Sequence, residues 1–209
     1  MQAQRFVFDL DGTLLTSDPK LERDYFQSIY GDYGDDLVDQ IPELLDVYEN
    51  QFPRYDIQML SDYMTSKTNF EVTPQIVHDW VHILAGVPDT KEEDVHEVLE
   101  YLRKKDYSLA VLTNWFGDTQ IPRLKKAGLL DYFDEIYTGD RFLKPHKEAF
   151  ITAIGDYRPD EAVFIGDSVN RDYIGPRACG MYSILYDKKE QHHKTLKKIK
   201  SLDELMKKY

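Results

Sequence analysis

Two carboxylates near the start of the chain are the residues best suited by type and spacing to do chemistry. Asp9 and Asp11 follow the apolar residues 6–8, and a Gly12-Thr13 turn comes directly after them. A short apolar run that ends at a turn signal indicates a buried strand, and its period of two places residues i and i+2 on the same side. Adjacent carboxylates beside an apolar core need a compensating positive charge or a catalytic duty. We therefore expect Asp9 to be a nucleophile and Asp11 the neighbour that handles protons.

Two later apolar runs also end in polar residues. Residues 109–112 lead into Thr113 and Asn114, and residues 162–165 lead through Gly166 into Asp167 and Ser168. Ligands of open α/β sheets bind in the crevice beyond the carboxyl ends of the strands. If the three strands are parallel neighbours, one crevice collects all of these side chains. An isolated Asp after a strand is more often a turn residue, and an isolated Thr is more often a helix cap. The catalytic interpretation therefore rests on the meeting of all these side chains at one edge of the sheet.

The elements that must position these residues fall into two kinds. Strand-like runs alternate with helical patterns outside residues 16–88, which predicts an α/β fold with a mostly parallel sheet covered by helices on both faces. Residues 16–88 have helical spacing instead, with four expected helices. We expect a catalytic core of residues 1–15 and 89–209 with a helical cap, residues 16–88, inserted into it. Thr90-Lys91-Glu92-Glu93 has the pattern of a capping box that opens the next helix.

Composition narrows the function classes. The 209 residues carry 26 basic and 38 acidic side chains, a net charge of −12, which disfavours nucleic acid as a partner. No apolar run approaches the roughly 18 residues that span a bilayer. We expect no signal peptide, because the chain enters a strand at once. The one cysteine, Cys179, fits a reducing compartment. We expect a cytoplasmic enzyme, monomeric or homodimeric, without membrane partners, whose lysine-rich residues 187–209 form a solvated amphipathic helix.

The polar strand ends resemble four motifs of the haloacid dehalogenase-like hydrolases, most of which are phosphatases. All four occur in the usual order and spacing, so the resemblance covers essentially the whole chain. The matching segments are Asp9-Leu10-Asp11-Gly12-Thr13, Leu112-Thr113-Asn114, Lys144-Pro145 and Gly166-Asp167-Ser168-Val169-Asn170-Arg171-Asp172.

The resemblance implies a Rossmann-like core with a helical cap between the first and second motifs. It also implies Mg²⁺-dependent hydrolysis of a small phosphate ester through an aspartyl-phosphate. Asp9 is then the nucleophile, and Asp11 protonates the leaving oxygen and later deprotonates water. The metal ligands are Asp9, the backbone carbonyl of Asp11, Asp167 and, directly or through water, Asp172.

The resemblance also assigns the groups that hold the phosphoryl group. Thr113 donates a hydrogen bond to it, and Lys144 balances the acids and steadies Asp9. Gly12 lets the chain turn tightly beside the phosphate. Asn114 either contacts the phosphate or shapes the loop.

Several functions remain open on the sequence alone. A haloacid dehalogenase does not need the acid at Asp11, whereas a phosphomutase of the same fold uses all four motifs. A non-catalytic module that responds to phosphorylation of an Asp belongs to a different class. Because residues 16–88 hold four basic side chains against ten aromatic ones, we expect a neutral or aromatic leaving group and not a second phosphate. We also expect the cap to open over Gly86 and residues 15–16.

Overall fold

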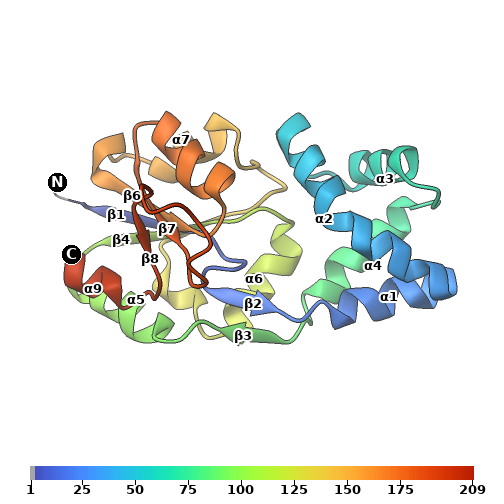
Figure 1. Cartoon of the computed structure of the whole chain (residues 1–209), viewed down its shortest axis with the longest axis horizontal. Coiled ribbons are helices and arrows are strands. Elements are labelled where there is room, and N and C mark those ends of the chain that lie inside the picture. Colours follow the sequence, from blue (N-terminus) through green and yellow to red (C-terminus); the bar gives the residue numbers. More distant parts are fainter. Residues whose placement is uncertain (1–2) are drawn as a thin grey trace.

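A six-stranded parallel sheet forms the centre of the larger part of the molecule (Figure 1). The structure is a computed structural model, and it describes residues 3–209. The strand order is β5-β4-β1-β6-β7-β8, and every neighbouring pair is parallel. The strands are β1 (Arg5–Phe8), β4 (Ser108–Leu112), β5 (Glu135–Tyr137), β6 (Ala162–Gly166), β7 (Tyr182–Tyr186) and β8 (Lys198–Ile199). This topology confirms the predicted α/β class.

Helices cover both faces of this sheet, as the alternation along β1 requires. Phe6 and Phe8 enter an apolar cluster on one face, whereas Val7 enters a separate cluster on the other. The first face is covered by α5 (Val95–Lys104), α6 (Gly117–Lys126) and α9 (Glu204–Lys208), and the second by α7 (Lys147–Ile154). A short helix, α8 (Gly175–Ala178), follows a π-helical turn over Val169–Ile174. β1 is therefore buried on both sides and rigidly held.

The three strands that carry the polar motifs are direct neighbours. Phe8 pairs with Val111 of β4 on one side and with Ile165 of β6 on the other. The chain segments that leave these three strands therefore emerge together at one edge of the sheet. The prediction that the three strands are parallel neighbours is confirmed.

Four helices between β2 (Leu15–Ser17) and β3 (Asp89–Lys91) form the smaller part of the molecule (Figure 1). They are α1 (Lys20–Tyr30), α2 (Gly34–Gln51), α3 (Ile57–Lys67) and α4 (Pro74–Leu84). Side chains cap two of them: Asp56 accepts from backbone N–H groups at the start of α3, and Thr73 from Ile76 at the start of α4. Their apolar faces meet around Trp80 and Tyr48, in a cluster that also takes in Trp115, Phe116 and Leu143 of the sheet part.

Backbone contacts help to join the helices to the sheet part. β2 and β3 pair antiparallel, so the chain leaves and returns along a single ribbon. The segment between α2 and α3 adds backbone hydrogen bonds, from Tyr55 N–H to the Gly139 carbonyl at 2.7 Å and from Leu143 N–H to the Pro53 carbonyl at 2.9 Å. These bonds seat the helices directly over the carboxyl edge of the sheet.

Two local predictions were wrong. Residues 89–91 form β3 and not a helix start, and α5 begins at Val95 without a side-chain cap. Glu92 faces away from the helix because its carboxylate accepts from Tyr186 and Lys188. Residues 187–203 are mostly irregular, since Asp187 pairs with Lys198 of the short edge strand β8. The only helix after residue 187 is α9. Tertiary ion pairs override the local pattern at both places.

Among the helices of residues 3–209, none combines the length and the apolar character needed to cross a bilayer.

Candidate active site

Asp9 lies at the end of β1, where it is buried at the floor of a cleft. Its Oδ1 accepts from the N–H of Leu10 at 2.7 Å and from Lys144 Nζ at 2.8 Å. Its Oδ2 receives no hydrogen bond from the residues that the structure describes. One oxygen of the carboxylate is thus fixed, and the other is free to react.

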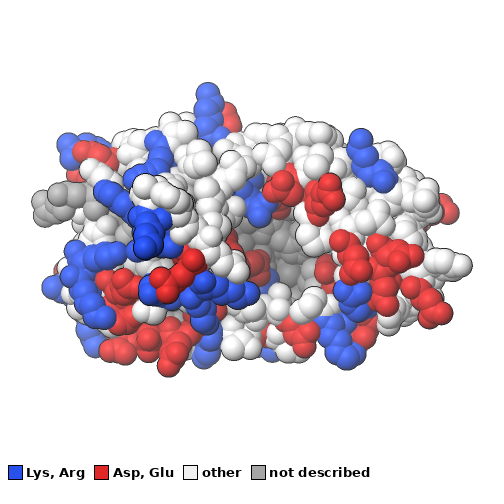
Figure 2. All heavy atoms as spheres, in the orientation of Figure 1, with Lys and Arg blue, Asp and Glu red and all other residues white. Residues whose placement is uncertain are grey.

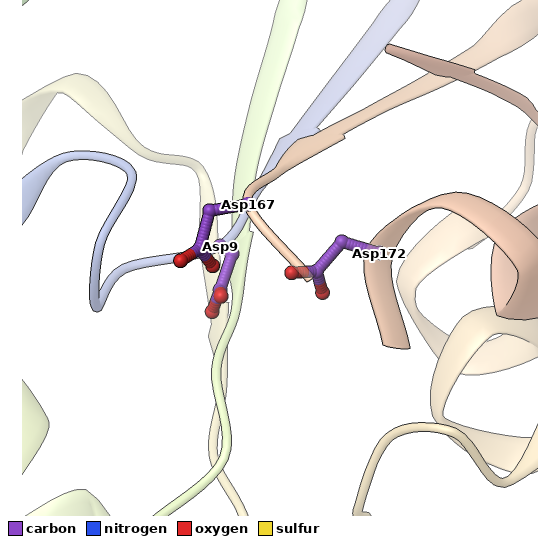
Figure 3. Close-up of side chains that lie close together, drawn as sticks. All are labelled: Asp9, Asp167 and Asp172. Atoms are coloured by element: carbon purple, nitrogen blue, oxygen red, sulfur yellow. The ribbon is translucent and has the colours of Figure 1, made fainter. Parts of the chain in front are cut away.

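Asp9 forms a cluster with Asp167 and Asp172, which come from the end of β6 and from the π-helical turn (Figure 3). One oxygen of each carboxylate lies within 4.8 Å of the others. Burial raises the pKa of Asp9 well above its usual value, with Asp172 and Asp167 adding to the rise and Lys144 opposing it. Burial and then Asp172 raise the pKa of Asp167 to about 6. The cluster therefore carries more negative charge than its surroundings compensate.

The cluster fits a hard divalent cation. Carboxylate oxygens are the ligands that Mg²⁺ and Ca²⁺ prefer, and Asp167 has no ion-pair partner among residues 3–209. The chain keeps space around the acids, since a Cβ added to Gly12 would lie 2.5 Å from Asp167 Oδ2. Gly12 also has a φ of +76°, which favours glycine. Asp11, the remaining expected ligand, keeps its carboxylate outside this cluster.

Lys144 is the positive charge beside the cluster. Its fully buried Nζ lies 2.8 Å from Asp9 Oδ1 and 2.7 Å from Asp172 Oδ1. Burial alone would lower the pKa of Lys144, but Asp172 and Asp9 together raise it, so the ammonium stays charged.

Asn114 holds the backbone of Lys144 in place. The Asn114 Oδ1 accepts from the Lys144 N–H at 2.9 Å, and its Nδ2 donates to the Lys144 carbonyl at 3.0 Å. Both ends of the Asn114 amide are thus occupied by the Lys144 backbone. This favours the expectation that Asn114 shapes the loop over the alternative that it contacts phosphate.

Asp11 has a separate set of partners. Its carboxylate lies 2.7 Å from Arg123 Nη2 and accepts from Gln120 Nε2, also at 2.7 Å. Gln120 Nε2 further donates to Thr113 Oγ1 at 2.9 Å, and Gln120 Oε1 accepts from Arg123 at 2.6 Å. Gln120 thus connects Asp11 with Thr113, which follows β4 directly, as expected.

Sequence reasoning missed Gln120 and Arg123. They lie three residues apart on α6, and both are buried. A signal was available, because α6 starts directly after the second motif and its first turns must therefore lie near the strand ends. Polar residues spaced i, i+3 on such a helix deserve a place among the candidates.

Most of the expected site residues line one cavity between the sheet edge and the helices. The cavity measures about 360 Å³ and includes Asp9, Asp11, Thr113, Lys144 and Asp167 in its wall. Figure 2 shows this hollow between the two parts of the molecule, with acidic side chains at its rim. Its volume is at the small end of ligand-binding pockets, which suits a small substrate.

A family model described as haloacid dehalogenase-like hydrolase matches residues 4–180. Among curated proteins, the pyrophosphatase PpaX of Bacillus cereus (strain Q1) is 26% identical over 186 residues, which cover 86% of this chain and 81% of that protein.

Solved structures share the whole architecture. A HAD phosphatase from Thermococcus onnurineus superposes with a TM-score of 0.67 at 26% identity, covering 99% of this chain and 97% of that one. The L-2-haloacid dehalogenase of Xanthobacter autotrophicus superposes with a TM-score of 0.75 at 17% identity, covering 99% and 98%. The second similarity shows the fold alone.

Proposed function

The chain belongs to the haloacid dehalogenase-like hydrolases, and from this membership we propose that it is a Mg²⁺-dependent phosphatase that acts on a small phosphomonoester. One observation carries the proposal: Asp9 and Asp11 line the same cavity but are held by different partners. Asp9 is buried and paired with Lys144, a setting that suits a nucleophile, whereas Asp11 is half exposed and suits proton exchange.

In the first step Asp9 attacks phosphorus. A bond forms between its carboxylate oxygen and phosphorus, and the bond from phosphorus to the ester oxygen breaks. Lys144 steadies Asp9 through Oδ1, so Oδ2 is the atom that we assign to the attack. Thr113 lies at the neighbouring strand end, where its hydroxyl can bind a phosphoryl oxygen.

Asp11 moves the protons. Its carboxylic acid gives a proton to the departing ester oxygen, which leaves as the alcohol. In the second step the Asp11 carboxylate takes a proton from water, whose oxygen displaces Asp9 from phosphorus and releases inorganic phosphate. Gln120 and Arg123 hold Asp11 in the orientation that both transfers need.

Asp9, Asp167 and Asp172 would hold the Mg²⁺, which when bound neutralises negative charge on the carboxylates and the phosphate. We further propose residues 16–88 as the cap that covers the bound ester and keeps bulk water away, with residues 1–15 and 89–209 as the catalytic core. The hydrogen bonds of the segment between α2 and α3 to the core favour the closed arrangement.

Hydrolysis of pyrophosphate is the second candidate, because relatives at 26% identity are named pyrophosphatases. The cavity argues against it. The two arginines in its wall, Arg123 and Arg171, are each already paired with two carboxylates. Dehalogenation is less favoured because it gives no role to Asp11, which this chain holds in place with two buried side chains.

The test is turnover of p-nitrophenyl phosphate with MgCl₂ by the full chain. Asp9→Asn should abolish turnover, and Asp131→Asn, an exposed acid outside the cavity, should leave it unchanged. Asp11→Asn should slow turnover and let a phosphorylated protein accumulate, visible by intact-mass spectrometry. Full activity of the Asp9→Asn variant would refute the nucleophile, and a stable phosphoprotein in the unaltered chain without turnover would favour a phosphate-responsive module.

A further inference from the structure

The helical side of the cavity presents acids to the leaving group. Asp18, which precedes α1, Glu22 on α1 and Glu49 on α2 all line it. Glu49 already pairs with Arg171 at 2.8 Å. Glu22 differs from Glu49, because no Lys or Arg nitrogen among residues 3–209 lies within 4.0 Å of its carboxylate.

Each Lys or Arg that the structure describes in the cavity wall already has acidic partners. Lys144 lies 2.8 Å from Asp9 and 2.7 Å from Asp172. Arg123 lies between Asp11 and Asp89, each at 2.7 Å. Arg171 lies between Asp46 at 2.9 Å and Glu49 at 2.8 Å. A carboxylate or a second phosphate on the substrate would therefore meet charges that are already neutralised, and it would face Glu22 as well.

Glu22 is a partly buried carboxylate held by a single neutral donor. Trp80 Nε1 donates to its Oε1 at 2.7 Å. The adjacent Arg23 is turned elsewhere, toward Asp35 and Asp39, both at 2.9 Å. Burial raises the pKa of Glu22, because the carboxylate loses water without gaining a full counter-charge. A cation brought by the substrate would supply that counter-charge.

Trp115 gives independent evidence that this part of the cavity awaits a ligand. It directly follows the second motif with a φ of +84°, a strained value for a bulky residue. Its ring is fixed between Trp80 and Tyr55, at centroid distances of 4.6 and 5.1 Å. The side chain is 9% exposed, and its Nε1–H has no acceptor among the described residues. A buried donor without an acceptor is costly, and an oxygen of the substrate would satisfy it.

We propose that Glu22 selects a phosphomonoester whose leaving group is a small alcohol bearing a protonated amine, with the ammonium paired to the Glu22 carboxylate. This inference rests on the proposed phosphatase function. It keeps the expectation that the leaving group carries no second phosphate, but it replaces the expected neutral or aromatic group with a cationic one. The cavity of about 360 Å³ has room for a small alcohol beside the phosphate.

Three two-carbon esters that differ only in the end group test the proposal on the unaltered chain. They are 2-aminoethyl phosphate, 2-hydroxyethyl phosphate and 2-phosphoglycolate, which end in an ammonium, a hydroxyl and a carboxylate. We expect kcat/KM to fall in that order. A best rate with the carboxylate, or turnover of p-nitrophenyl phosphate without turnover of any of the three, overturns the proposal and leaves the phosphatase function standing. No turnover of any of the four esters overturns both.

Glu22→Gln removes the charge and keeps an oxygen that can accept from Trp80. It should lower kcat/KM for 2-aminoethyl phosphate by about tenfold, the loss expected for one charge-assisted hydrogen bond. The rate with 2-hydroxyethyl phosphate should stay within about twofold of the unaltered chain, as for a neutral hydrogen bond that glutamine can also make. Glu43→Gln, an exposed change on α2, is the matched control. An unchanged preference for the ammonium ester in Glu22→Gln would overturn the role of Glu22.

Discussion

Replacing Arg123 with methionine should destabilise the protein by about 3–5 kcal/mol, because it leaves a buried carboxylate without its partner. Only 5% of the Arg123 side chain and 6% of the Asp89 side chain are exposed. Two Arg123 nitrogens reach Asp89, Nη2 at 2.7 Å and Nε at 3.1 Å. Methionine fills similar space but cannot donate to Asp89.

A double-mutant cycle isolates the pair from the other contacts of Arg123. Urea unfolding at pH 8 would be measured for Arg123→Met, Asp89→Asn and the combined variant. Because the combined variant no longer buries an unpaired charge, we expect a coupling energy of at least about 2 kcal/mol.

Arg103 provides a matched surface pair with the same separation. Arg103 Nη1 lies 2.7 Å from Asp134 Oδ1, but the two side chains are 41% and 38% exposed. Arg103→Met should therefore cost only about 0–1 kcal/mol. Equal losses of unfolding free energy in Arg103→Met and Arg123→Met would refute the idea that burial makes the Arg123 pair the stronger one. A coupling energy near zero between Arg123 and Asp89 would refute it as well. The combined variant should also remain slow in turnover after its stability returns, because Asp11 still lacks its guanidinium.

Three further outcomes follow from the same contacts. Glu92→Gln should cost about 1–2 kcal/mol at pH 7: burial alone would raise the pKa of Glu92, but hydrogen bonds, first from Lys188, lower it. The Glu92 carboxylate thus stabilises the fold fully above its usual pKa of 4.5, and this stabilisation is lost as the pH falls through its lower pKa in the folded protein. Urea unfolding from pH 7 to 3 should therefore show the stability difference between the unaltered chain and Glu92→Gln disappear. Asn114→Ala should cost about 1–3 kcal/mol and lower kcat, because both backbone groups of Lys144 lose their partner; unchanged kcat would count against a positioning role. EDTA should abolish turnover reversibly, and MgCl₂ should raise the Tm of the unaltered chain by more than that of Asp167→Asn.

The strands and their polar ends could be predicted from the sequence because these features are local. Phe6, Val7 and Phe8 form an unbroken apolar run that ends at a turn, which indicates a strand buried on both faces. Three such runs that each end in polar residues favour one shared crevice, and the parallel order β4-β1-β6 confirms that the three strands are neighbours. The start of helix α4 (Pro74–Leu84) is likewise specified locally, since Thr73 supplies its cap within three residues.

The orientation of the reactive groups was decided by tertiary structure. Asp9 and Asp11 are two residues apart, yet one is bound by Lys144 and the other by Arg123, residues more than 100 positions away. Glu92 shows the same effect on secondary structure, because its bonds to β7 and to Lys188 replaced the capping box that its neighbours suggest. Periodicity and turn residues act over a few positions and determine where elements begin and end. Ion pairs depend on which buried groups meet after the sheet has formed, and only the folded chain determines that.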